Sequence, residues 1–188
     1  GPFSIAFNLR GINHLCEEVA LAPEATAAFL WRLAENQAGF CRAVAQAGLD
    51  LAFFESAASP PMLSPRQFHE IELPALRRIL EIASECVGHP VPCIMGGNTY
   101  PILDDLLSTG TGYVVCNVET NQRAFVESAS RTHPSVKIRV NLDPGVVACQ
   151  EPERIYRAVD TILGITAGRP NCLMGTGALP LETPPVNI

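Results

Sequence analysis

The sequence predicts an α/β fold with a parallel sheet, because short apolar runs alternate with amphipathic helical stretches along the chain. The apolar runs are almost continuous, which is expected of strands that are buried on both faces. Gly48, Gly88 and Gly110 stand where helical stretches should end. Two architectures accommodate this alternation, an open doubly wound sheet and a closed (β/α)8 barrel of the TIM type.

The alternation indicates about six strands and five helices. The expected strands cover residues 4–7, 49–55, 91–95, 113–116, 136–140 and 172–175. The expected helices cover residues 23–47, 65–87, 100–108, 122–131 and 151–164. Ser64 followed by Pro65 is typical of a helix start. No G-x-G-x-x-G follows the first strand and there is no phosphate-binding loop, so nucleotide-binding open sheets are disfavoured.

The composition is that of a compact globular domain and excludes several classes of protein. Hydrophobic residues make up 47% of the 188 residues, and charged residues make up 17%. The net charge of −6, without any Lys/Arg run, argues against a nucleic-acid partner. No apolar stretch approaches the roughly 18 residues of a membrane helix. Seven widely spaced cysteines without a C-x-x-C pair favour reduced thiols, and with no signal peptide they predict a cytoplasmic protein.

The carboxyl ends of the expected strands carry amides and carboxylates. In parallel α/β folds the catalytic and binding side chains lie at these ends. The candidates for substrate binding are Asn8, Ser56, Gly96, Gly97, Asn98, Asn117, Asn141 and Thr176, and those for proton transfer are Glu55, Glu119 and Asp143. No histidine is among them, so neither a Ser-His-Asp triad, a Cys-His pair nor a metal site is predicted.

These residue types suit the recognition of a heterocycle. A carboxylate accepts two N–H donors from an aminopyrimidine edge, and an amide supplies one donor and one acceptor, as a pterin requires. Asn98, Asn117, Asn141 and the three acids also have a structural explanation, because Asn side chains bond to nearby backbone in turns and acids cap the helix that follows. Gly96 and Gly97 indicate either a close approach of a ligand or a tight turn.

Several motifs resemble the uroporphyrinogen decarboxylase superfamily, and they occur in its order over nearly the whole chain. The resembling segments are GPFSIA at 1–6, LSPRQF at 63–68, NLDP at 141–144, EPERI at 151–155, GALP at 177–180 and TPPVNI at 183–188. The resemblance implies a (β/α)8 barrel, for which about 250 residues are typical. We therefore expect one incomplete barrel domain over residues 1–188, with about six βα units present and the N-terminal part missing.

The superfamily has two main branches, and the residues that differ favour one of them. One branch decarboxylates a tetrapyrrole without a cofactor, and the other transfers methyl groups between a corrinoid and a thiol or folate. Ser56 matches the serine of a Ser-Trp dipeptide in the decarboxylases, but Ala57 replaces the tryptophan. Asn8 and Thr176 stand at the positions of a substrate-contacting tyrosine and a histidine. The run that begins at Glu55 looks more like the methyltransferase version.

The zinc ligands of the thiol-methylating enzymes are absent. Their H-x-C-G-N segment is similar to IMGGN at 94–98, and their later G-C is similar to Gly177-Ala178. Zinc activates a thiol by stabilising the thiolate, so thiol methylation would lose its mechanism here. A folate needs no such metal once its pterin ring is fixed in place.

The resemblance therefore implies a zinc-independent methyltransferase that moves a methyl group between a methylcobalamin-type corrinoid and a pterin such as tetrahydrofolate. Asn98, Asn117 and Asn141 would orient the pterin, and one of the three acids would read its donor edge. A corrinoid-binding protein is the expected partner. A barrel that lacks strands exposes sheet edges, which the missing segment or a second copy in a homo-oligomer would cover. Two alternatives are a uroporphyrinogen decarboxylase-like enzyme of porphyrin (heme) biosynthesis and a ligand-binding barrel without catalysis.

Overall fold

The computed structural model describes residues 1–148 and 151–187. The chain divides into two compact units, which we call the N-terminal unit (Gly1–Val114) and the C-terminal unit (Val115–Ile188). Each unit is described by itself.

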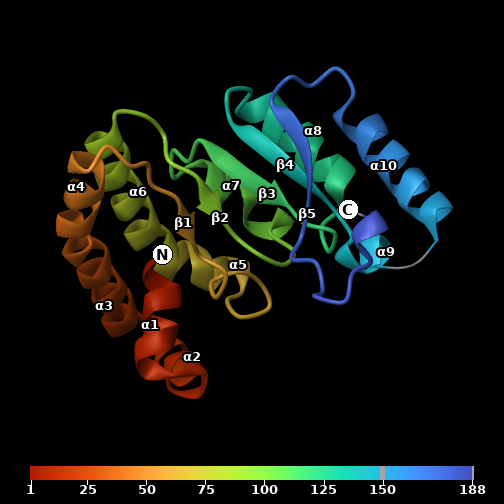
Figure 1. The fold of residues 1–188 in the computed structure, drawn as a ribbon. Coiled ribbons are helices and arrows are strands. Elements are labelled where there is room, and N and C mark those ends of the chain that lie inside the picture. The colour runs from red at the N-terminus through yellow and green to blue at the C-terminus, as the bar shows by residue number, and fades with distance from the viewer. Residues whose placement is uncertain (149–150, 188) are drawn as a thin grey trace. The chain divides into compact units, whose positions relative to one another are not determined.

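The N-terminal unit is mainly helical. Its helices are α1 (Pro2–Arg10), α2 (Ile12–Leu21), α3 (Pro23–Asn36), α4 (Ala38–Gln46), α5 (Pro65–Gln67), the π-helix η1 (Phe68–Glu72), α6 (Leu73–Val87), the 3₁₀-helix η2 (Tyr100–Ile102) and α7 (Leu103–Leu107). Its strands β1 (Phe53–Phe54) and β2 (Cys93–Ile94) pair in parallel. These elements can be followed from red to green in Figure 1.

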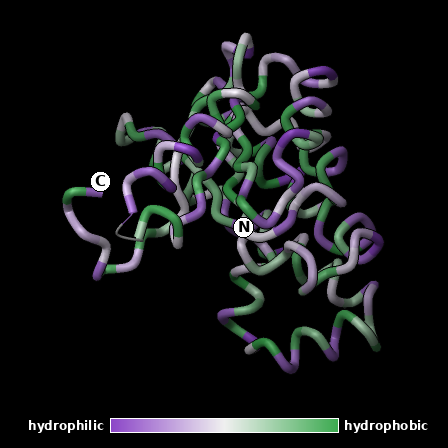
Figure 2. Tube along the Cα trace, turned by 90° about the vertical axis from the view of Figure 1, so that its right-hand side faces the viewer, coloured by the Kyte–Doolittle hydropathy of each residue, from purple (hydrophilic) through white to green (hydrophobic). Residues whose placement is uncertain are grey.

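Helix α6 is the centre of this unit, because α3 and α4 both pack against it. Leu76, Ile79 and Leu80 recur at helical spacing and are almost completely buried. Burying each such side chain contributes about 1.5–3 kcal/mol. The alternation of apolar and polar residues along the helices can be followed in Figure 2. The helix ends at Gly88, whose φ of 80° is the left-handed conformation that a glycine adopts readily.

The expected strand at 4–7 is wrong, because these residues belong to α1. A short apolar run does not distinguish a strand from a buried helix. Phe3 and Ala6, three residues apart, are both 0% exposed, which is the spacing of a helix face rather than a strand face. Asn8 therefore lies on a helix, not at a strand end, and its Nδ2 donates to the backbone oxygen of Ser4 over 2.9 Å.

Other helices also differ from the expectation. Helix α2 was not expected at all. The expected helix at 23–47 is divided into α3 and α4 at Gln37. The expected helix at 65–87 contains the π-helix η1, and Ser64 and Gln67 form a complete capping box at its start.

The C-terminal unit alternates strands and helices as expected. Its elements are β3 (Tyr113–Cys116), which begins in the preceding unit, α8 (Gln122–Thr132), β4 (Lys137–Leu142), α9 (Pro144–Ala148), α10 (Pro152–Thr166), β5 (Cys172–Thr176) and the 3₁₀-helix η3 (Pro185–Asn187). The strands form one sheet in the order β3-β4-β5, and β4 and β5 are parallel. Helices α8 and α10 both contact β4, where Ile138 and Val140 are 0% exposed.

Parallel strands joined by helices confirm the predicted α/β class. The described residues contain five strands, in sheets of two and three, where about six were expected. The closed barrel and its number of units stay predictions. No helix in the described residues is both long and apolar enough to cross a membrane.

Candidate functional site

Two amide side chains meet in the C-terminal unit, at the ends of neighbouring strands. Asn117 directly follows β3, and Asn141 is the penultimate residue of β4. Nδ2 of Asn141 donates a hydrogen bond to Oδ1 of Asn117 over 3.0 Å. Gln122, the first residue of α8, donates from Nε2 to the backbone oxygen of Asn141 over 2.7 Å. The structure thus brings together two of the three predicted asparagines, which we call the amide pair.

Asn141 carries an unsatisfied acceptor. The residue is 3% exposed, and its Oδ1 has no hydrogen-bond partner among the described residues. Leaving a buried carbonyl oxygen without a donor costs about 1–3 kcal/mol. A ligand that presents an N–H group would remove this cost.

The other candidates of this unit are placed differently. Asp143 accepts a hydrogen bond at Oδ1 from the backbone nitrogen of Gly145 over 2.7 Å, at the start of α9. This is the turn-forming role of an Asp side chain. Glu119 is exposed between β3 and α8. Thr176 is the last residue of β5 and is half-buried.

Arg139 is a cation that reasoning from the strand ends missed, because it lies within β4 rather than after it. It shares one face of the strand with Asn141, two residues further on. Its Nε is buried and has no partner in the described part of the chain. The polar-apolar alternation over residues 137–142 (K-I-R-V-N-L) was the signal that could have placed Arg139 beside Asn141.

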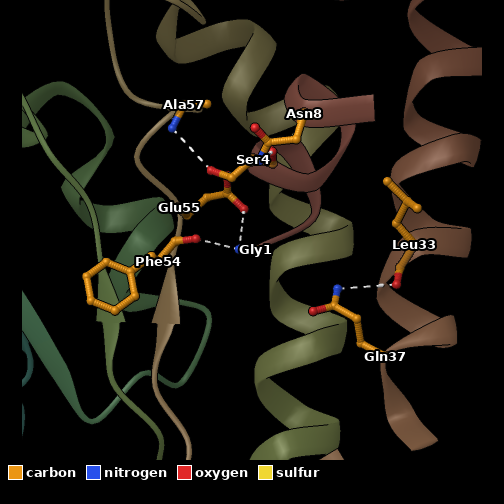
Figure 3. Close-up of polar contacts among 8 residues, drawn as sticks. All are labelled: Gly1, Ser4, Asn8, Leu33, Gln37, Phe54, Glu55 and Ala57. Atoms are coloured by element: carbon orange, nitrogen blue, oxygen red, sulfur yellow. Dashed lines mark hydrogen bonds and ion pairs between the residues drawn. The ribbon is translucent and has the colours of Figure 1, made fainter. Parts of the chain in front are cut away.

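In the N-terminal unit, Ser4 of α1 binds the carboxylate of Glu55, the residue after β1 (Figure 3). Oε1 of Glu55 accepts from the backbone nitrogen of Ser4 over 2.7 Å and from its Oγ over 2.6 Å. Oε2 lies 3.3 Å from the backbone nitrogen of Gly1. The backbone nitrogen of Ala57 donates to Oγ of Ser4 over 3.3 Å. Glu55 is 0% exposed, and its hydrogen bonds to Ser4 connect the end of β1 to α1.

A second buried acid, Glu72, faces Glu55 from the end of η1, and we call the two residues the acid pair. Glu72 is also 0% exposed, and neither of its carboxyl oxygens accepts a hydrogen bond from a described residue. Burial, the negative charge of Glu55 and a hydrogen bond between the two carboxyl groups raise the pKa of Glu72 well above its usual value. Of the acid pair, Glu72 is therefore the residue whose pKa favours the protonated form.

Sequence reasoning missed Glu72 although a signal was present. Phe68, Glu72 and Leu76 are spaced by four residues, and the two apolar neighbours are 0% exposed. That spacing places an acid on the buried face of a helix. In the structure, the π-turn that ends at Glu72 also draws attention to this residue, because such turns are frequent at functional sites.

The remaining candidates of this unit lie around the loop after β2. Gly97 has a φ of 71°, which explains the glycine as a turn residue. Asn98 is exposed and accepts at Oδ1 from the backbone nitrogen of Tyr100 over 3.2 Å, the structural alternative that the sequence left open. Gly96 is half-buried, and Ser56 is exposed.

Metal ligands do not gather in residues 1–148 and 151–187, since no three His, Cys, Asp or Glu side chains there are placed to hold an ion. Burial raises the pKa of the Cys116 thiol to about 12. The pKa of Cys93, which lies in β2 near the acid pair, is raised by burial and by the charge of Glu55. Cys149 lies outside the described residues.

Comparison with known proteins gives a family and a fold. The family model described as uroporphyrinogen decarboxylase (URO-D) matches residues 1–188. No curated protein matches the chain. Among solved structures, the chain is similar to a methyltransferase from Methanosarcina mazei, with a TM-score of 0.76 and 19% sequence identity over 100% of this chain. The chain spans 53% of that protein, about half its length, and at this identity the likeness shows the fold alone.

Proposed function

The chain belongs to the uroporphyrinogen decarboxylase family, and on that premise we propose that it is a methyltransferase which binds a pterin through the amide pair. The methyl group passes between N5 of a pterin such as tetrahydrofolate and a methylcobalamin-type corrinoid. The corrinoid is carried by a separate protein, and the corrinoid supplies or accepts the methyl group. The likeness of the fold to a methyltransferase supports this branch of the family.

The observation that carries the proposal is the unsatisfied Oδ1 of Asn141. Asn117 holds the Nδ2 side of this amide, and Gln122 holds its backbone oxygen, so the orientation of Oδ1 is fixed before a ligand arrives. The aminopyrimidine ring of a pterin offers N–H donors of the kind that this oxygen lacks. A pre-oriented acceptor loses little entropy on binding, which favours affinity.

The contribution of the chain to the reaction is positioning. Methyl transfer requires the donor atom, the methyl carbon and the acceptor atom to lie in line, so a fixed ring orientation lowers the barrier. The amide pair would orient the ring by accepting an N–H donor at Oδ1 of Asn141, and the corrinoid would supply or accept the methyl group. Among the acids, Glu119 is exposed and remains the candidate for the donor edge of the pterin.

Calorimetric titration of the full protein with 5-methyltetrahydrofolate tests the proposal. We expect micromolar binding, and we expect Asn141→Ala to weaken it by at least about 1 kcal/mol, or roughly fivefold, because the amide contacts are lost. Asn36→Ala, which changes an exposed amide in α3, is the matched control and should bind as the unaltered protein does. Absence of folate binding together with tight binding of uroporphyrin would refute the proposal.

A decarboxylase of the uroporphyrinogen type is the second candidate, and Arg139 is the observation that favours it. The acetate groups of such a substrate need cations, and this guanidinium lies on the same sheet face as Asn141. Conversion of uroporphyrinogen, measured as the release of CO₂, would decide for this candidate. The same assay in the presence of methylcobalamin and tetrahydrofolate would show whether methyl transfer competes.

A further inference from the structure

Arg139 is a cation on the candidate sheet face that has no ion-pair partner among the described residues. The parallel register aligns Asn141 with Gly175 and Arg139 with Leu173. Because side chains alternate along a strand, these four residues share one face of the sheet. Within the described ranges no carboxylate forms an ion pair with Arg139, and its Nε is the arginine nitrogen there that is buried without a hydrogen-bond partner.

Gly175 sets the course of the Arg139 side chain. A Cβ at Gly175 would lie 2.6 Å from Cδ and 3.0 Å from Cγ of Arg139, so the arginine stem occupies the space that a side chain there would need. Gly175 is aligned with Asn141, nearer to the carboxyl end of the sheet than Arg139 itself. The stem therefore leans along the strand and carries its Nε toward the level of the amide pair.

Two polar atoms on this face are complementary and both unsatisfied. Nε of Arg139 is a buried donor and Oδ1 of Asn141 is a buried acceptor, and neither has a partner in residues 1–148 and 151–187. Each unsatisfied group disfavours the ligand-free protein. A ligand that satisfies both must present one acceptor and one donor side by side.

We propose that Arg139 and Asn141 together bind a lactam edge, with the ligand's carbonyl oxygen accepting from Arg139 and its adjacent ring N–H donating to Asn141. This inference rests on the proposed function, and it names which edge of the pterin is bound: the 4-oxo group and N3–H. A carboxylate fits less well. It would satisfy Arg139 but would leave Oδ1 of Asn141 facing another acceptor, without a donor.

The test compares folic acid with aminopterin by isothermal titration calorimetry on the full protein. Aminopterin has the same glutamate tail, but a 4-amino group replaces the 4-oxo group, so the order of donor and acceptor along this edge is reversed. We expect folic acid to bind at least about tenfold more tightly than aminopterin. Arg139→Leu should lower the affinity for folic acid by about tenfold and should leave the affinity for aminopterin unchanged.

Two further variants separate the position of Arg139 from its charge. Gly175→Ala keeps the charge but displaces the arginine stem, so it should also lower the affinity for folic acid while leaving that for aminopterin unchanged. Lys137→Gln removes an exposed charge from the same strand and should affect neither ligand.

Three outcomes overturn the inference. If Arg139→Leu lowers the affinity for both ligands equally, Arg139 binds the glutamate tail that the two ligands share. An Arg139-dependent affinity for uroporphyrin, with no preference between the two pterins, would assign it to an acetate group. If the unaltered protein binds neither pterin, the proposed function fails with it, whereas binding without selectivity refutes the lactam edge alone.

Discussion

Replacing Glu72 by Gln should make the protein more stable at neutral pH, because Gln is a neutral analogue of the protonated acid. Glu72 and Glu55 are both 0% exposed, and only one of two adjoining buried carboxyl groups can be charged at moderate cost. The raised pKa of Glu72 means that the folded chain holds a proton that the unfolded chain releases at about pH 4.3.

The sign and size of the effect follow from this difference. The stability that protonated Glu72 provides is complete below about pH 4.3, and it is lost as the pH rises toward the pKa in the folded chain. Each pH unit in that window costs up to about 1.4 kcal/mol of the free energy of unfolding. From pH 5 upward the unaltered protein should therefore lose stability relative to Glu72→Gln, and this loss should end where the pH exceeds the raised pKa of Glu72 in the folded chain.

Urea unfolding followed by circular dichroism, at half-unit steps from pH 5 to pH 7, measures this difference. Glu70→Gln is the matched control, because Glu70 lies in the same π-helix but is exposed and pairs with Arg66. Its free energy of unfolding should follow that of the unaltered protein at every pH. If Glu72→Gln shows the same pH dependence as the unaltered protein, Glu72 is not the proton carrier of the acid pair.

Two further predictions concern glycine conformation and thiol reactivity. Gly88→Ala should destabilise the protein by about 1 kcal/mol or more, because φ is 80° there. Gly39→Ala within α4 should instead stabilise it by about 0.5–1 kcal/mol, since nothing lies within 4 Å of the added Cβ. Thermal unfolding of the two variants measures both changes. In the folded protein at pH 8, the exposed Cys16 should react with Ellman's reagent within minutes, while Cys116 stays unreacted because burial raises its pKa to about 12.

The alternating half of the fold could be predicted from the sequence, and the helical start could not. The strand expected at 113–116 coincides with β3, and β4 and β5 differ from their expected ranges by only one or two residues at an end. Each of these strands lies between helices of the alternating pattern, which supports the assignment beyond the apolar run itself. At residues 4–7 a short apolar run does not distinguish a strand from a helix, and the packing of Phe3 and Ala6 stabilises a helix there.

Glu72 and Arg139 escaped prediction because both were sought at the wrong places. Functional side chains of parallel α/β folds are expected after the end of a strand. Arg139 lies inside β4, and its long side chain leans toward the strand end. Glu72 lies on a helix, and its importance depends on Glu55, which is distant in sequence and meets it only in the folded chain. A single sequence carries no record of such contacts.

The placement of the acids changes which side chains are available to a ligand. The carboxylate of Glu55 is held by Ser4 and faces Glu72, and Asp143 bonds to the turn that starts α9. Acids with such partners lose them if they turn to a substrate, which costs about 1.5–3 kcal/mol for each bond to a charged group. Among the unsatisfied buried groups of the C-terminal unit are instead an amide oxygen and a guanidinium nitrogen, on Asn141 and Arg139. Recognition by these two groups therefore requires no structural bond to break, which favours a neutral donor–acceptor edge over chemistry that depends on the buried acids.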